Sequence, residues 1–118
     1  MATVSSHTLN SVNGTHAGGI AATLIRIGKE GERAELFESV TDEGGRFTHE
    51  IPEDMIDSSA TYELILQIGE YFDRTQPSQD GTRFLREVVV RFTMPDPGAR
   101  YHIPFMLAPN SYSVWLSG

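Results

Sequence analysis

The chain has 118 residues, which suits a single domain covering residues 1–118 with its own hydrophobic core. It has no cysteine and a formal net charge of −7, which excludes a disulfide scaffold and argues against nucleic acid as a partner. No apolar stretch is long enough to cross a membrane, and the N-terminal residues lack a basic and apolar leader. We therefore expect a cytoplasmic protein without a membrane partner.

Segments with alternating apolar and polar residues, separated by turn-forming residues, recur about every ten residues along the chain. In chain order, the alternation predicts strands over residues 3–10, 20–27, 34–41, 46–51, 61–68, 86–93 and 101–108, with a last strand from residue 111. A helical turn is expected near residues 52–54, and a short helix over residues 69–76 that ends before Pro77. This order of short strands predicts an all-β sandwich or barrel.

The segment 101–108 differs from the other predicted strands because both of its faces are apolar. With period two, one face holds Tyr101, Ile103, Phe105 and Leu107. The opposite face holds His102, Pro104, Met106 and Ala108. This face is too apolar to be exposed to water, although it carries an imidazole. After a turn at residues 109–110, one side of the alternation holds Ser111, Ser113 and Trp115, and the other holds Tyr112, Val114 and Leu116. We predict a closing hairpin whose outward face lines a cleft between subunits.

The common local motifs of metal sites, nucleotide-binding loops and serine hydrolases are absent from the sequence. The four histidines are dispersed, so we expect no metal and no cofactor; they are His7, His16, His49 and His102. Taken alone, His7 and Arg46 are typical of ordinary surface residues, and His102 is equally typical of a structural or a functional residue. The residues by themselves therefore lead no further than an oligomeric all-β domain.

Several segments together resemble the 5-hydroxyisourate hydrolase family, the transthyretin-related proteins. The similarity runs from about residue 5 to the end of the chain, and the segments that carry it are 6–10 with 14–20, 41–46, 62–72, 91–92, Pro97, 101–104, Pro109 and 111–113. The resemblance implies a transthyretin-like two-sheet sandwich of about eight strands with one short helix. It also implies a homotetramer, built as a dimer of dimers, with active sites in the channel where the dimers meet and a small molecule as the substrate.

The same resemblance implies which residues form the site. His7, Arg46 and His102 stand where the hydrolases carry catalytic residues. A histidine can move protons near neutral pH, and a guanidinium can stabilise the oxyanion formed when a cyclic amide carbonyl is attacked. The residues expected to face the channel and bind substrate are Leu9, Pro104, Met106, Ser111, Ser113 and Trp115.

The tail departs from the family pattern. Where the hydrolases carry Tyr-Arg-Gly-Ser, this chain has Trp115, Leu116, Ser117 and Gly118, which removes a phenol hydroxyl, a guanidinium and a terminal hydroxyl. Loss of one transition-state donor can lower a rate by about 10²–10³-fold. The first hypothesis is hydrolytic ring opening of 5-hydroxyisourate in urate breakdown. The second is ring opening, cyclisation or isomerisation of a different small metabolite by His/Arg proton transfer, and the third is a non-catalytic carrier of a small ligand.

Overall fold

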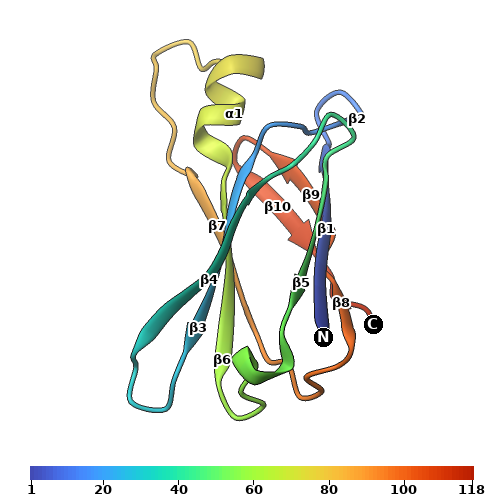
Figure 1. Cartoon of the computed structure of the whole chain (residues 1–118). Helices are drawn as coiled ribbons and strands as arrows, with labels where there is room; N and C mark the ends of the chain where they lie inside the picture. Colours follow the sequence, from blue (N-terminus) through green and yellow to red (C-terminus); the bar gives the residue numbers. More distant parts are fainter.

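Two β-sheets face each other in the computed structural model, which describes residues 1–118 (Figure 1). The first sheet contains β1 (Ala2–Asn10), β2 (Thr15–His16), β5 (Arg46–Ile51), β8 (Arg100–His102), β9 (Phe105–Ala108) and β10 (Ser111–Val114). The second sheet contains, in spatial order, β4 (Arg33–Val40), β3 (Ala21–Ile27), β6 (Thr61–Gln67) and β7 (Glu87–Phe92). The predicted all-β two-sheet sandwich is therefore confirmed.

Strand β1 is the centre of the first sheet. It pairs antiparallel with β5 on one side and parallel with β8 and β9 on the other. Its even-numbered residues, Ala2 to Asn10, are all buried, whereas the residues between them are partly exposed. Because side chains alternate across a strand, Ser5, His7 and Leu9 share the outward face of this sheet.

The hydrophobic core fills the space between the two sheets. From the second sheet, Leu24, Leu64 and Leu66 are fully buried, and from the first sheet Phe105 and Leu107 meet them with no exposed surface. Burial of one such side chain stabilises the fold by about 1.5–3 kcal/mol. This core fixes which face of β1 points outward, because a slip of one residue would turn its apolar residues toward water.

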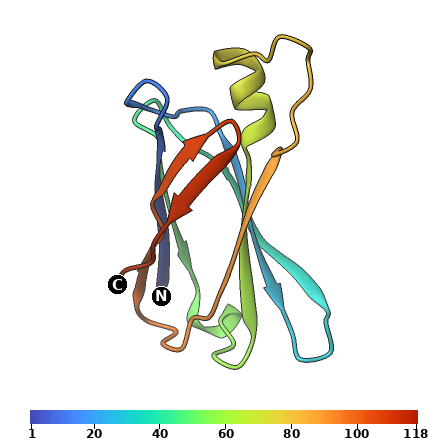
Figure 2. The same ribbon diagram turned by 180° about the vertical axis from the view of Figure 1, so that it is seen from behind.

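The predicted strand over residues 101–108 is interrupted and forms two strands, β8 and β9. The break lies at Ile103 and Pro104, and the proline has no N–H to donate to a neighbouring strand. The Ile103 N–H still donates to the Ser5 carbonyl, at 2.9 Å, so both pieces stay beside β1. The predicted closing hairpin is present, with Ser111 opposite Ala108 in an antiparallel β9–β10 pair (Figure 2).

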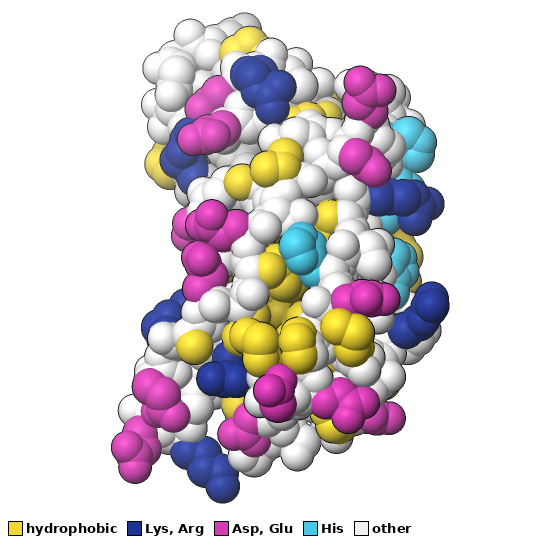
Figure 3. Space-filling model, viewed as in Figure 1, with side chains coloured by type: hydrophobic (Ala, Val, Ile, Leu, Met, Phe, Trp, Pro, Cys, Tyr) yellow, Lys and Arg dark blue, Asp and Glu magenta, His cyan; other side chains and the backbone are white.

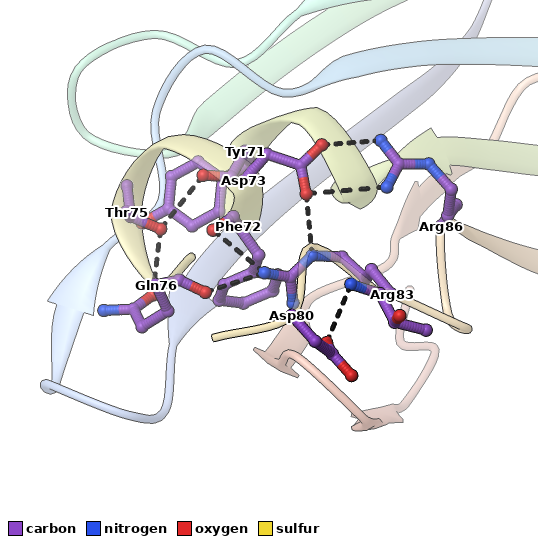
Figure 4. A network of polar contacts seen from close by, with 9 residues as sticks. Tyr71, Phe72, Asp73, Thr75, Gln76, Asp80, Arg83 and Arg86 are labelled. Atoms are coloured by element: carbon purple, nitrogen blue, oxygen red, sulfur yellow. Dashed lines mark hydrogen bonds and ion pairs between the residues drawn. The ribbon is translucent and has the colours of Figure 1, made fainter. Parts of the chain in front are cut away.

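Helix α1 (Ile68–Thr75) starts one residue earlier than expected and lies between β6 and β7. Figure 4 shows how the loop after it is held. The side chain of Arg83 is 3% exposed and donates to Asp73 Oδ1 at 2.9 Å and to the Gln76 carbonyl at 2.7 Å. Arg86 and then Arg83, both bonded to the Asp73 carboxylate, lower its pKa to about 2. No helix has both the length and the apolar surface needed to span a bilayer.

The two sheets meet at one open side of the sandwich, between the edge strands β4 and β5. Figure 3 shows apolar side chains gathered there, with acidic and basic side chains around them. The imidazole of His49 on β5 lies parallel to the Phe37 ring on β4, with ring centres 4.2 Å apart. Leu36 and Ile56, both partly buried, pack against the core. These contacts show that His49 is a packing residue between the two sheets.

Candidate functional site

Three strands bring the predicted residues His7, Arg46 and His102 onto one face of the first sheet. In the β1–β5 pairing, His7 lies directly opposite Arg46. In the β1–β8 pairing, Ser5 lies directly opposite His102. Because Ser5 and His7 are two residues apart on β1, their side chains and those of their partners point the same way. The result is a patch with two imidazoles and one guanidinium on the outward side of the sandwich.

His102 is held from two directions. Its Nδ1 shares a hydrogen bond of 2.8 Å with the Ser5 hydroxyl, and the side chain is half-buried. Its backbone N–H donates to the Ser117 carbonyl at 2.8 Å, and the Ser117 N–H donates back to the His102 carbonyl at 3.0 Å. The hydrogen bond to Ser5 orients the ring, and the backbone pair ties the tail of the chain to β8. Ser5 was not among the predicted site residues.

His7 has a neighbour that the sequence analysis did not assign to the site. Its Nε2 lies 2.9 Å from Nδ1 of His16, which stands on β2 opposite Leu9. Burial, followed by the positive charge of Arg46 and then of His16, lowers the pKa of His7 below its ordinary value of 6.5. His7 is therefore a neutral imidazole at pH 7 and can accept a proton.

The residues predicted to bind substrate continue the same face. Met106 on β9 lies between Leu9 on β1 and Ser113 on β10, each directly opposite it in the strand pairing. The Met106 side chain is 41% exposed, although it is apolar. Ser111 follows on the exposed side of β10. These four residues form an apolar and hydroxyl-bearing row beside His7.

Two other predicted residues have different surroundings. Pro104 is buried in the connection between β8 and β9. Trp115 follows β10 directly and is 51% exposed, and Leu116 beside it is 47% exposed. Both precede Ser117, the residue bonded to His102. Trp115 and Leu116 are thus held within a few residues of the imidazole patch and remain open to solvent.

In a single chain, this patch is open to solvent. The one cavity of the fold, about 370 Å³, lies elsewhere, on the second sheet between β3 and β4, and its lining includes Ala22, Glu38 and Val40. No group of three or more His, Asp or Glu side chains is arranged to hold a metal ion. What the patch offers is a neutral imidazole as proton acceptor, a second imidazole with a fixed orientation, and a guanidinium that can bind a developing negative charge.

The chain is similar to known proteins in both sequence and fold. Residues 4–116 match the model of the HIUase/Transthyretin family. The chain is 33% identical over 112 residues to the 5-hydroxyisourate hydrolase of Halalkalibacterium halodurans, covering 95% of this chain and 94% of the relative. The structure of the Klebsiella pneumoniae 5-hydroxyisourate hydrolase superposes with a TM-score of 0.73 at 25% identity, over 100% of both chains. Transthyretin from Sparus aurata shares the fold, with a TM-score of 0.80 at 22% identity over 97% of this chain and 95% of that one.

Proposed function

The chain belongs to the HIUase/transthyretin family, and on this basis we propose that it is an enzyme that opens the ring of 5-hydroxyisourate with water, a step in urate breakdown. The observation that carries the proposal is the patch of His7, Arg46 and His102, three residues from three strands on one face of the sheet. A pure carrier has no need for a neutral imidazole beside a guanidinium, whereas hydrolysis of a cyclic amide uses both.

The three residues have distinct roles in the proposed reaction. The oxygen of a water molecule attacks a ring carbonyl and forms a C–O bond, while neutral His7 accepts the proton that the water loses. Arg46 stabilises the negative charge that develops on the carbonyl oxygen. The ring C–N bond then breaks, and His102, oriented by Ser5, supplies the proton that the leaving nitrogen needs. The new carboxylic acid ionises, so one proton is released per turnover.

The proposed active unit is a homotetramer, a dimer of dimers in which the patch of one chain faces that of another. Two features support this assembly: the patch is open in the single chain, and the apolar side chains of Met106, Trp115 and Leu116 are 41%, 51% and 47% exposed. Exposed apolar side chains that lie together in this way are typically covered by a partner at a protein–protein interface. Sedimentation velocity should give the mass of four chains, and a monomer would contradict the proposed assembly. The cytoplasmic location and the domain limits of 1–118 stay predictions.

A second function is favoured by one specific observation. Trp115 and Leu116 stand where the hydrolases carry tyrosine and arginine, and the Ser117–His102 backbone pair holds this altered tail beside the imidazoles. An indole and an isobutyl group make the site flatter and more apolar than a phenol and a guanidinium would. The alternative is therefore proton transfer on another small cyclic metabolite, in a ring opening, cyclisation or isomerisation. A non-catalytic carrier of a small ligand is the third candidate.

The deciding experiment generates 5-hydroxyisourate in place from urate and urate oxidase and follows its ultraviolet decay with and without the protein. Decay well above the uncatalysed rate supports the proposed function. Loss of that acceleration in His102→Ala, and its retention in His49→Ala, would assign it to the patch, because His49 packs between the sheets instead. Decay at the background rate, with a folded parent protein, contradicts hydroxyisourate hydrolysis and favours the alternative ligand.

A further inference from the structure

Strand β2 is only two residues long, and its pairing with β1 fixes the position of the His16 side chain. Its residues pair with the end of β1, with Thr15 opposite Asn10 and His16 opposite Leu9. The turn before it is fixed by Asn13, whose side-chain oxygen accepts from the Thr15 N–H at 3.1 Å and from the Thr15 hydroxyl at 2.6 Å. A short, well-defined turn therefore delivers the exposed His16 to the rim of the patch.

The contact between His16 and His7 is one that two imidazoles make only when they share a proton. His16 Nδ1 and His7 Nε2 are 2.9 Å apart, with ring centres 5.0 Å apart and ring planes tilted by 31°. Two lone pairs or two N–H groups at this distance would repel, so one nitrogen donates and the other accepts. The Gly44 backbone beside the His7 ring favours the protonated form and acts to raise the pKa of His7. A hydrogen on Nδ1 suits this neighbour, so we assign the His7 hydrogen to Nδ1, and Nε2 then accepts from His16.

This arrangement leaves one free basic nitrogen in the pair, Nε2 of the exposed His16. A proton that binds there gives a cation whose Nδ1–H already points at His7. The positive charge is better solvated on exposed His16 than on half-buried His7, which faces Arg46 on β5 and has His102 on β8 nearby. The carboxylate in this region, that of Asp42, accepts from the Arg46 backbone N–H at 2.9 Å.

We propose that His16 is a positioning residue for His7 and the exposed end of a two-imidazole unit that exchanges the reaction proton with solvent. The inference rests on the proposed function, in which His7 takes the proton of the attacking water. In the unit, the proton that the water loses binds the free Nε2 of His16 while the Nδ1 hydrogen of His16 passes to Nε2 of His7, so His7 gains one proton. The reverse transfer then releases one proton from His16 Nε2 to solvent, which returns the pair to its starting state, and no oxidant or co-reactant is needed.

The test compares the parent protein with His16→Gln, which keeps a polar side chain but does not titrate, and with His49→Gln as the matched loss of a histidine away from the patch. Nuclear magnetic resonance titration of ¹⁵N-labelled imidazoles follows His7 directly. In the parent, we expect His7 in the Nδ1–H form, with a titration curve coupled to the second ring. In His16→Gln, the His7 midpoint should move up toward 6.5, because one positive neighbour is gone. His49→Gln should leave it unchanged.

The second measurement is the rate of turnover of 5-hydroxyisourate. We expect kcat for His16→Gln to fall about tenfold with little change in KM, less than the 10²–10⁴-fold loss typical of a missing general base. Added imidazole should restore part of the rate in His16→Ala, which a merely structural role would not allow. An unchanged His7 titration together with an unchanged kcat in His16→Gln would overturn the inference. If the parent itself does not turn over 5-hydroxyisourate, the proposed function fails, and the titration alone decides whether the pair shares a proton.

Discussion

Replacing Asn10 by alanine tests how strongly the end of β1 is tied to helix α1. Asn10 has no exposed surface, and its Nδ2 donates to the Tyr71 hydroxyl and to Gln76 Oε1, both at 3.1 Å. Its Oδ1 accepts from the Val12 N–H at 2.9 Å. Each bond contributes about 1 kcal/mol, and a buried group left unpaired costs at least as much, so Asn10→Ala should lower the free energy of unfolding by about 3 kcal/mol. At about 4 °C per kcal/mol for a domain of this size, Tm should fall by about 12 °C.

The matched control is Asn13→Ala, three residues along the same turn. Asn13 also makes side-chain hydrogen bonds, two of them and both to Thr15, but it is exposed. Water can replace those bonds, so the loss should stay within about 0.5 kcal/mol. Urea unfolding followed by circular dichroism measures both variants. If Asn10→Ala and Asn13→Ala lose equal stability, the reasoning from burial is refuted.

Four further predictions concern the patch and the loop after α1. His102→Ala should abolish turnover and leave the assembly mass unchanged; unchanged turnover would remove His102 from the mechanism. Because the pKa of His7 is lowered below 6.5, its neutral form persists as the pH falls to 6.5, and kcat/KM should decline only at lower pH; a decline beginning at higher pH contradicts a neutral His7. Arg83→Ala removes a buried guanidinium bonded to Asp73 and to two carbonyls, and should cost about 2 kcal/mol with faster proteolysis of the loop over residues 76–86. Restoring the family tail with Trp115→Tyr and Leu116→Arg should raise the rate on 5-hydroxyisourate about 10²-fold if the tail limits it, and an unchanged rate would show that it does not.

Most of the sandwich could be predicted because alternation in the sequence is strong where one face of a strand is buried. On β6, one face of the strand holds the buried residues Tyr62, Leu64 and Leu66. The strand forms at the residues where this alternation predicts it. The break at Pro104 was missed, because apolar residues on both sides continue the alternation through it. Strand β2 was missed because two residues are too few to show any period.

The site could be predicted only in part, since residues meet there through strand register. His7 and Arg46 become neighbours because β1 and β5 pair at those two positions, and periodicity within either strand says nothing about that pairing. Family resemblance supplied it. Ser5 and His16 carried no such signal, although the Asn13-Gly14 turn was visible and fixes the register that sets His16 opposite Leu9. Reading that hairpin through to its register would have found His16.

The tail held against His102 has a spectroscopic consequence. Trp115 is the only tryptophan among 118 residues, and it lies two residues before the backbone pair that joins Ser117 to β8. Its indole is half-exposed, so its fluorescence should be that of a tryptophan in contact with water. Any ligand or second chain that covers the patch would exclude this water and change the emission. Tryptophan emission in this protein is therefore a built-in optical probe of one location, able to follow occupancy and assembly without a label.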